Sequence, residues 1–386
     1  MQKAFREFCY RYLRTADMLK RSSKPIKVLV IGNYPPPMCG WAIQTYLVTA
    51  ELRRRGQVCE VLKINENRMV KSPDYVNVQD GWDYLAKIVY FTLCGYRLNV
   101  HVNGTSKKGY LLALSAAITG RFRFRPIALT FHGGLTQNYF PRHDSWWLHY
   151  AFRLLFQSAG KIACDSFEIK DAIEGYGINP LKITPIATFS PQYLTFKSVN
   201  LPGEVERFLS ERDPVVLSYL SFRPEYRLEV VREGMKRFRR RYSDAGFIWL
   251  GFPAGELSLA REFVNAWTEE ERHSLLLLGN LAHDDFLTLL TRCSVCLRSP
   301  ACDGVAASVL EALGLGVPVV ASENGRRPAG VITYSDEDAA DMSAKMVYVM
   351  ENYNAIRAHL DGSLNGDNVQ DNVAYMADWL TQLERR

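Results

Sequence analysis

The stretch DGVAASVLEALGLGVPVVAS, from Asp303 to Ser322, holds the pattern that decides the fold. A short polar loop leads into an apolar helical pattern from about Ala306 to Leu313, and Gly314 and Gly316 end that pattern. An apolar run preceded by a proline follows, as expected for a buried strand. The stretch therefore predicts a loop, a helix and a parallel strand in quick succession.

The start of this helix is a candidate anion site. The N–H groups of a first helical turn have no partner within the helix, so they suit a phosphate or pyrophosphate. Gly304 in the preceding loop permits close approach of the backbone. Glu311 lies one turn further on and can accept hydrogen bonds from a ribose diol, while Asp303 in the loop can do so for a sugar ring. The first-turn residues are Ala307, Ser308 and Val309.

The rest of the chain repeats this alternation of apolar strands and amphipathic helices, which builds parallel sheets. Strands are expected at 27–34, 58–64, 98–104, 127–134, 161–166 and 183–189, and again at 214–220, 246–252, 273–280, 294–299 and 318–323. A proline-containing polar segment separates the two series. We therefore predict an α/β protein of two doubly wound domains, 1–195 and 196–365, facing each other across a cleft, followed by a final helix in 366–386.

The loop after the first strand, GNYPPPMCGW, is not a dinucleotide fingerprint, because no G-x-G-x-x-G follows the strand. Gly40, just before the next helix, allows backbone N–H groups to approach a ligand. The sequence also has no spacing of cysteines and histidines typical of a metal site. It predicts a site without metal or cofactor at the carboxyl ends of both sheets.

Charge is distributed unevenly along the chain. Residues 1–195 carry 26 basic and 13 acidic side chains, whereas residues 196–386 carry 21 and 28. A basic first half indicates an anionic partner, and no motif typical of nucleic-acid binding is present. With no apolar run long enough to span a bilayer and no signal peptide, a cytoplasmic location is expected.

Residues 1–24 form a basic amphipathic helical pattern with aromatic residues along one side. Two interpretations are equally open. The helix lies on an anionic membrane surface, or it packs on its own domain with a solvated basic face. Trp146 and Trp147 could add an interfacial anchor, although paired tryptophans on a helix are more often partly core.

The stretch from Asp303 onward resembles the retaining GT-B glycosyltransferases of the family 4 group, whose signature is E-x7-E followed by a small-residue turn and PVVAS. Here the signature reads Asp303-x7-Glu311 and then ALGLGVPVVAS. The resemblance extends over nearly the whole chain, and it implies that the final helix, in 366–386, crosses back to the first domain. It implies that Glu311 binds the ribose, Asp303 the donor sugar, and the backbone at Ala307 and Ser308 the diphosphate.

The same resemblance assigns a role to His132, at the end of TFHGG, against the donor sugar near the transfer centre. His101, which alternates within the strand of VHVNG, has no such context and is expected to be structural. The family's Arg and Lys for the diphosphate have no direct match, because YLSFRPEYRLE stands in their place. Arg223 and Arg227 are the candidates to neutralise the leaving group there, each equally well interpreted as a solvated arginine at a helix start. The family's paired glycine of the first loop is Cys39-Gly40.

The function implied by the resemblance is metal-independent transfer, with retention, of a hexose from a UDP- or GDP-sugar. The charge pattern adds a lipid-linked saccharide acceptor at the inner face of the cell membrane, in surface polysaccharide or glycolipid synthesis. Two alternatives remain on the same architecture: a nucleotide-sugar epimerase or hydrolase, and a non-catalytic membrane-associated subunit.

Overall fold

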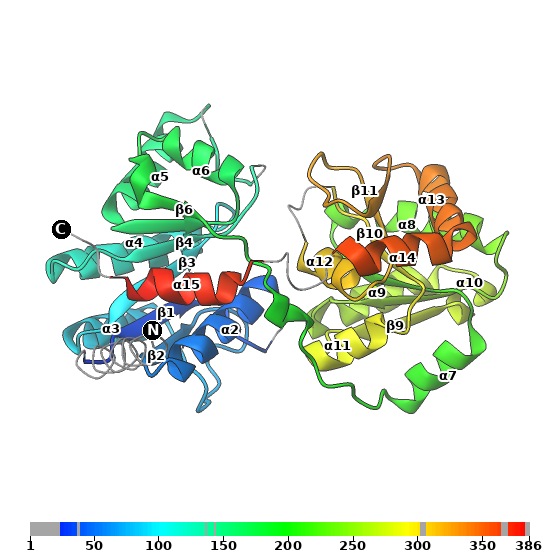
Figure 1. Cartoon of the computed structure of the whole chain (residues 1–386), viewed down its shortest axis with the longest axis horizontal. Coiled ribbons are helices and arrows are strands. Elements are labelled where there is room, and N and C mark those ends of the chain that lie inside the picture. Colours follow the sequence, from blue (N-terminus) through cyan, green and yellow to red (C-terminus); the bar gives the residue numbers. More distant parts are fainter. Residues whose placement is uncertain are drawn as a thin grey trace, which may run out of the picture.

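The computed structural model describes residues 24–36, 39–135, 137–142, 144–301, 306–363 and 370–382. Two six-stranded parallel sheets organise the chain into two domains that lie side by side (Figure 1). The predicted fold class, two doubly wound α/β domains, is confirmed. The helical pattern at 1–24, Asp303 and Gly304 lie outside the described residues.

The first sheet has the order β2-β1-β3-β4-β5-β6. Its strands are β1 (Lys27–Gly32), β2 (Val58–Lys63), β3 (Arg97–Val102), β4 (Ala128–Phe131), β5 (Lys161–Cys164) and β6 (Ile183–Pro185). All five pairings are parallel, so the carboxyl ends of the strands share one edge of the sheet. The loops that follow β1, β4 and β5 therefore meet at that edge.

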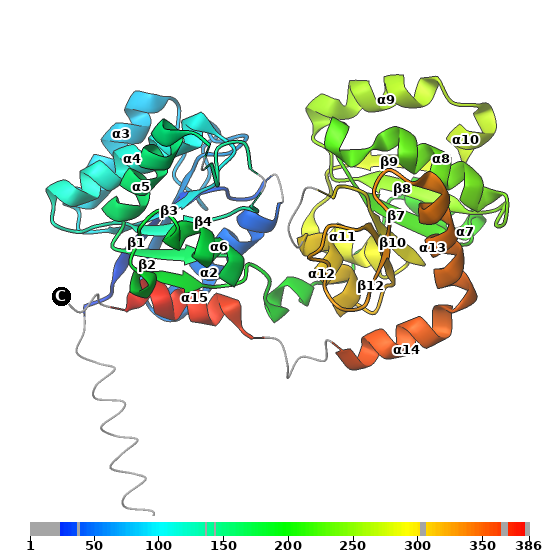
Figure 2. The same ribbon diagram turned by 90° about the horizontal axis from the view of Figure 1, so that it is seen from above.

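Helices cover both faces of this sheet. One face packs on α3 (Gly81–Leu93), α4 (Lys107–Phe122), α5 (Trp146–Ser158) and α6 (Phe167–Glu174), through an apolar cluster that includes Ile88, Ala116 and Phe152. The other face packs on α2 (Gly40–Arg54) and on α15 (Asn372–Thr381), the last described helix of the chain. Figure 2 shows α3, α4 and α5 on one side of the sheet and α15 on the other.

The second sheet has the order β12-β11-β10-β7-β8-β9 and is also parallel throughout. Its strands are β7 (Val215–Tyr219), β8 (Gly246–Leu250), β9 (Leu275–Gly279), β10 (Val295–Arg298), β11 (Val319–Ser322) and β12 (Val331–Tyr334). Helices α7 (Gly203–Glu211), α11 (His283–Leu290) and α12 (Ala307–Gly314) pack on one face, and α8 (Leu228–Arg239), α9 (Leu257–Asn265) and α13 (Ala339–Glu351) on the other. Two further helices are α10 (Glu269–His273) and α14 (Tyr353–Ser363).

The chain passes between the domains twice. The first passage lies between β6 and β7, and the predicted boundary at residue 195 falls within it, directly after a short 3-10 helix, Pro191–Leu194. The second passage precedes α15, whose start is tied to the first passage because Asn372 donates a buried hydrogen bond to the Phe189 carbonyl at 2.7 Å. No helix among the described residues is long and apolar enough to cross a membrane.

Candidate functional site

The two domains meet where α2 and α12 begin. A Cβ added to Gly40, the first residue of α2, would lie 3.7 Å from the Cβ of Ala307, the first residue of α12. The Tyr193 hydroxyl donates to the Gly40 carbonyl at 3.0 Å, and Ile43 packs with Leu310 in a small apolar cluster. The candidate phosphate-binding helix of the second domain therefore faces the candidate ligand loop of the first.

Neither of these helix starts is capped. The N-cap residues Cys39 and Ala306 make no side-chain hydrogen bond to the first turn, and neither first turn contains an acidic residue. Asp, Ser or Thr side chains cap the starts of α3, α4, α6, α10, α13 and α15, whereas α5, α7, α8, α9 and α11 are uncapped as well. What distinguishes α2 and α12 is that their uncapped starts face each other. Each uncapped end carries the partial positive charge of the helix dipole. Two such ends facing each other make a site suited to an anion.

Glu311 lies one turn inside α12 and is buried, with only 3% of its surface exposed. One carboxylate oxygen, Oε1, lies 2.8 Å from His283 Nε2 at the start of α11. Sequence reasoning gave His283 no role, although it follows a short turn that contains Gly279 and begins a helix at the carboxyl edge of the second sheet. The contact holds Glu311 in one orientation and leaves the second oxygen, Oε2, for another donor.

His132 follows β4 and is fully buried. One face of its ring is covered by Trp41 from the first turn of α2, with ring centroids 4.4 Å apart in a stacked arrangement. Its Nε2 lies 3.1 Å from His101 Nδ1, and its Nδ1 lies 3.4 Å from Asp165 Oδ1. Gly133 beside it has a φ of +151°, and a side chain there would collide with Gln137. The sequence did not indicate Trp41 or Asp165, and it suggested only a structural role for His101.

The hydrogen bonds around His101 determine the direction of the bond between the His101 and His132 rings. The Asn99 amide nitrogen lies 3.4 Å from the Ala128 carbonyl, which orients the amide so that its oxygen faces His101 Nε2 at 2.9 Å. His101 therefore carries its proton on Nε2. Burial and the neighbouring His132 hold the pKa of His101 well below its usual value, so it is neutral and its Nδ1 accepts from His132 Nε2. The remaining His132 nitrogen, Nδ1, faces the Asp165 carboxylate.

Arg223 and Arg227 both lie in the segment after β7, but carboxylates engage each of them. Arg223 Nε is 3.7 Å from Glu256, and its side chain is 61% exposed. Arg227 Nε is 2.8 Å from Glu337 at the start of the α13 region. The structure does not bring either arginine into contact with the start of α12.

Three other arginines lie at the carboxyl edge of the second sheet. Arg298 ends β10, is buried, and donates to the Tyr219 carbonyl at 2.7 Å. Arg327, in the loop after β11, donates to the Ser322 and Pro300 carbonyls. Arg326 is exposed and faces the first domain, where a Cβ on Gly134 would lie 3.9 Å from its Nη1. Sequence reasoning missed them, and the available signal was an arginine at the end of one buried strand and an Arg-Arg pair separated by three residues from the end of the next.

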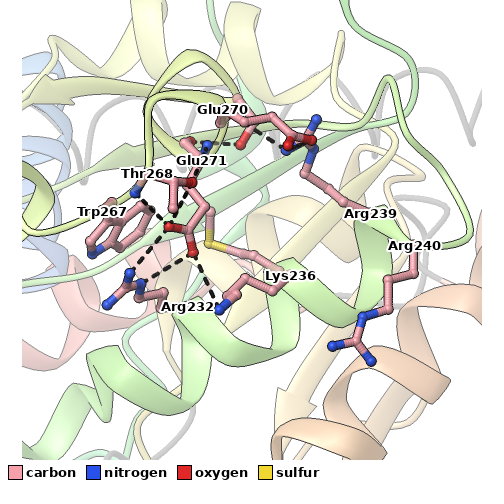
Figure 3. A pocket seen from close by; sticks show the side chains of 10 residues that line it. Arg232, Lys236, Arg239, Arg240, Trp267, Thr268, Glu270 and Glu271 are labelled. Atoms are coloured by element: carbon pink, nitrogen blue, oxygen red, sulfur yellow. Dashed lines mark hydrogen bonds and ion pairs between the residues drawn. The ribbon is translucent and has the colours of Figure 1, made fainter.

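A pocket of about 280 Å³ lies elsewhere, on the outer surface of the second domain between α8 and α10 (Figure 3). Its centre is Glu271, which pairs with Arg232 at 3.1 Å and caps α10 through Thr268. Its basic groups thus surround a carboxylate that the protein itself supplies, so the pocket is a structural ion-pair network. Among the described residues no cluster of histidine, cysteine and carboxylate side chains could hold a metal ion.

Residues 204–361 match the family model of glycosyl transferases group 1. No curated protein matches the chain in sequence. Among solved structures it resembles Anabaena Alr3699/HepE in complex with UDP-glucose (14% identity, TM-score 0.61, 91% of this chain and 94% of that one). It also resembles a glycosyltransferase from Rickettsia africae ESF-5 (13%, 0.64, 92% and 98%). A third is the UDP-GlcNAc 2-epimerase of Neisseria meningitidis bound to UDP-GlcNAc (13%, 0.59, 90% and 96%).

At these identities the solved structures establish the fold, while the family model identifies the domain that carries Glu311 and the start of α12. The chain therefore has a GT-B fold of two Rossmann-like domains, and its second domain is a glycosyl transferases group 1 domain.

Proposed function

We propose that this protein is a retaining glycosyltransferase of the family 4 type that transfers a hexose from a UDP- or GDP-sugar without a metal ion. The observation that carries the proposal is the pair of uncapped helix starts, at Gly40 and Ala307, that face each other with Glu311 one turn inside α12. In a nucleoside diphosphate the phosphates and the ribose diol are separated by about one helical turn, which matches the separation between the start of α12 and Glu311.

In this proposal each part of the donor has its own group. The diphosphate lies at the N–H groups of Ala307 and Ser308, with Gly40 opposite. The Val309 N–H, the third candidate from sequence, already donates to the Ala306 carbonyl at 3.1 Å. The ribose diol donates to Glu311 Oε2, and His283 holds the other oxygen of the same carboxylate. Asp303 keeps the role toward the donor sugar that the family resemblance implies, and Gly304 keeps the role inferred from the sequence, in which a loop glycine lets the backbone approach the ligand closely.

When the bond between the sugar's anomeric carbon and the diphosphate breaks, one further negative charge develops on the leaving diphosphate, and the chain must stabilise it without a metal. The helix dipoles supply part of this stabilisation, and a nearby guanidinium supplies more. Arg326 is the best placed of the described arginines because it faces the first domain across the site. Arg223 and Arg227, the candidates from sequence, would first have to leave Glu256 and Glu337.

Transfer with retention requires the acceptor hydroxyl to attack on the face that the diphosphate leaves. The leaving phosphate then accepts the acceptor's proton, so the protein contributes chiefly position and charge stabilisation. His132 lies beneath Trp41 rather than open to solvent, so a direct contact with the sugar requires that Trp41 move. Without that movement His132 acts by supporting Trp41, against which its ring stacks.

The acceptor we propose is a lipid-linked saccharide at the cytoplasmic face of the cell membrane, in surface polysaccharide or glycolipid synthesis. The support is the basic character of residues 1–195 against the acidic character of residues 196–386. A peripheral chain with its basic half toward anionic lipid would keep the donor domain in the cytosol.

The test is a calorimetric screen of UDP, GDP and their sugars, followed by product analysis with a membrane extract as acceptor. We expect binding of one nucleoside diphosphate and formation of a glycoside whose anomeric configuration, read by NMR, equals that of the donor. An altered free nucleotide-sugar without any acceptor would instead identify an epimerase, and free sugar a hydrolase. Donor binding with no turnover under any acceptor would identify a non-catalytic subunit.

A further inference from the structure

The outer surface of α3, α4 and α5 is unusually apolar for a surface facing water. Of the 20 large hydrophobic side chains exposed among the described residues, 12 lie on these three helices or on the turn after α4. Isolated exposed hydrophobic residues are ordinary, whereas a contiguous set marks an interaction surface. The 12 are Trp82, Val89, Tyr90, Leu93, Leu111, Ile118, Phe122, Phe124, Trp146, Trp147, Tyr150 and Leu154.

These residues share one face because of their helical spacing. On α5, Trp146, Tyr150 and Leu154 follow each other at intervals of four, which places them along one side of the helix. The opposite side, with Phe152 and Leu155, packs on the sheet. The three helices lie next to one another over the same face of the sheet (Figure 2). Their outward sides therefore form one continuous surface, here called the α3–α5 face.

The charges of this region are almost entirely basic. Residues 81–160 contain nine Lys and Arg but only two acidic residues. Both acids are paired locally, Asp83 with Lys87 at 2.7 Å and Asp144 with Arg142 at 2.7 Å. The basic residues at the two ends of α4 form no ion pair with a described carboxylate; they are Lys107, Lys108, Arg121 and Arg123. The α3–α5 face thus combines apolar side chains with uncompensated positive charge.

This combination selects among the possible occupants. A protein partner, including a second copy of the chain, would bury an apolar core from which lysines are depleted, and a second copy would bring its own positive charge against this one. A bilayer with anionic headgroups accepts both features, because aromatic rings lie at headgroup depth and Lys and Arg pair with lipid phosphates. Seven of the 12 exposed side chains are Trp, Tyr or Phe.

We propose that the α3–α5 face is a docking surface for an anionic lipid bilayer. It is distinct from the amphipathic pattern at residues 1–24, and it goes beyond the proposed transfer reaction, since docking does not depend on which sugar is moved. In this arrangement Phe122, Phe124, Trp146 and Trp147 enter the headgroup region and the ends of α4 supply the charge.

The test is vesicle co-flotation of the full chain with phosphatidylcholine alone or mixed with phosphatidylglycerol. One variant replaces Phe122, Phe124, Trp146 and Trp147 by Ser, and another replaces Lys107, Lys108, Arg121 and Arg123 by Gln. Matched controls replace four exposed apolar residues elsewhere by Ser (Met69, Val70, Leu181 and Leu259) and four exposed arginines of the second domain by Gln (Arg240, Arg241, Arg261 and Arg357).

We expect the wild-type chain to float with anionic vesicles, each face variant to lose at least tenfold in partition coefficient, and both controls to behave as wild type. Brominated lipids should quench the tryptophan fluorescence of the wild type and quench the Trp146→Ser/Trp147→Ser chain less. Circular dichroism melts confirm that the variants fold.

Three outcomes would overturn the proposal. The face variants could float as well as wild type. Binding could depend on residues 1–21 alone, shown by a chain starting at Ser22 that no longer floats while the face variants do. Light scattering could show that the apolar variant dissociates a dimer without changing vesicle binding. Nucleotide binding, measured in parallel, would be untouched in each case, so this failure is distinguishable from that of the proposed function.

Discussion

Glu311 presents two carboxylate oxygens in different surroundings. Oε1 is held by His283, and Oε2 is the oxygen assigned to the ribose diol. Glu311→Gln keeps the shape of the side chain and removes its charge, so the diol loses a charged acceptor worth about 1.5 to 3 kcal/mol. We expect the Kd for the preferred nucleoside diphosphate to rise by about 10- to 150-fold, measured by calorimetry.

Glu311→Gln should also change how well the protein discriminates between a nucleotide and its 2′-deoxy form. Wild type should discriminate against the 2′-deoxy nucleotide, and Glu311→Gln should lose most of that discrimination because the hydroxyl and the carboxylate form one pair. Glu351→Gln, an exposed glutamate at the end of α13, is the control and should change neither value. A variant that binds the diphosphate weakly yet still discriminates would place the ribose elsewhere.

His132→Ala should lower kcat by at least tenfold while the nucleotide Kd stays within about twofold, because His132 lies in the first domain under Trp41 and away from Glu311. The variant leaves a cavity, so melting temperature is measured alongside, and His132→Asn keeps a polar group in the same space. His359→Ala, on the exposed side of α14, serves as the matched control. Equal loss of nucleotide affinity would contradict this placement of His132.

Some residues of the candidate site could be predicted from the sequence, and others could not. Glu311, Ala307 and Gly40 were predictable because each is fixed by a local strand-loop-helix pattern. His283, Trp41 and Asp165 were not, since each acts through a partner far along the chain, and only the folded structure brings it there. His101 was judged structural from its strand alone, but its hydrogen bond to His132 depends on the register of β3 against β4.

At the scale of elements, the facing starts of α2 and α12 offer a test that separates binding from folding. Gly40→Asp places a carboxylate at the first position of α2, where it interacts favourably with the helix dipole by about 0.3 to 1 kcal/mol. The same carboxylate would face the start of α12, 3.7 Å from Ala307. Stability should therefore hold or rise slightly while diphosphate affinity falls at least tenfold.

Gly40→Ser is the control for that variant, because it adds a side chain of similar reach without a charge and should cost little affinity. Binding is measured at low and high salt, since the repulsion should weaken as ionic strength rises. If Gly40→Asp binds the nucleoside diphosphate as wild type does, the diphosphate does not lie between the two helix starts.

The junction of α8 and α10 should control acid stability of the second domain. Burial alone would raise the pKa of Glu271, but hydrogen bonds from Arg232 and Thr268 lower it to about 2. Since the folded pKa lies below the unfolded value of about 4.3, Glu271 stabilises the fold above that pH, and its contribution is lost as pH falls from about 4.3 to about 2. Glu271→Gln should cost on the order of 3 kcal/mol at neutral pH and flatten the decline of stability in that window.

Urea titrations at a series of pH values test this, with Glu270→Gln as control. Glu270 is the neighbouring residue, but its side chain is 80% exposed, so its replacement should leave the free energy of unfolding nearly unchanged. A Glu271→Gln chain whose stability falls with acid as steeply as wild type would show that other carboxylates dominate.

The sequence predicted the central elements of both sheets but missed β12 and α14, and the difference follows from burial. Eleven of the twelve strands were expected because their apolar runs are buried on both faces of a parallel sheet. β12 was missed, since it is a four-residue edge strand whose first three residues are only half buried. Helix α14 was also missed, because it is largely exposed and few of its residues are apolar. Strands and helices at the edge of a domain bury few side chains, so the apolar pattern of their sequences is too weak to predict them.

At the scale of the whole molecule, the chain end returns to the domain where the chain begins. Helix α15 buries Val373, Met376 and Trp379 against α2 and the first sheet. Trp379 Nε1 donates to Thr184 Oγ1 at 3.2 Å, and the Lys161 ammonium lies 4.5 Å from its ring centroid. The expectation that a terminal helix crosses back came from the family resemblance, because the sequence of 366–386 alone does not indicate which surface the helix packs against.

Trp379→Ala is therefore a test of how stability is divided between the domains. Removing a buried tryptophan costs about 3 to 5 kcal/mol, which should lower the melting of the first domain by on the order of 10 °C. The second domain, with its own two apolar clusters, should keep its transition and its upward shift on binding nucleoside diphosphate. Calorimetry of wild type, Trp379→Ala and the control Tyr375→Ala, a half-exposed residue of the same helix, measures both transitions. A different result would be that Trp379→Ala lowers both transitions and the nucleotide shift together. In that case α15 would stabilise the assembled pair of domains rather than the first domain alone. The hydrogen bond between Asn372 and the Phe189 carbonyl, at the passage between the domains, would then be the contact responsible.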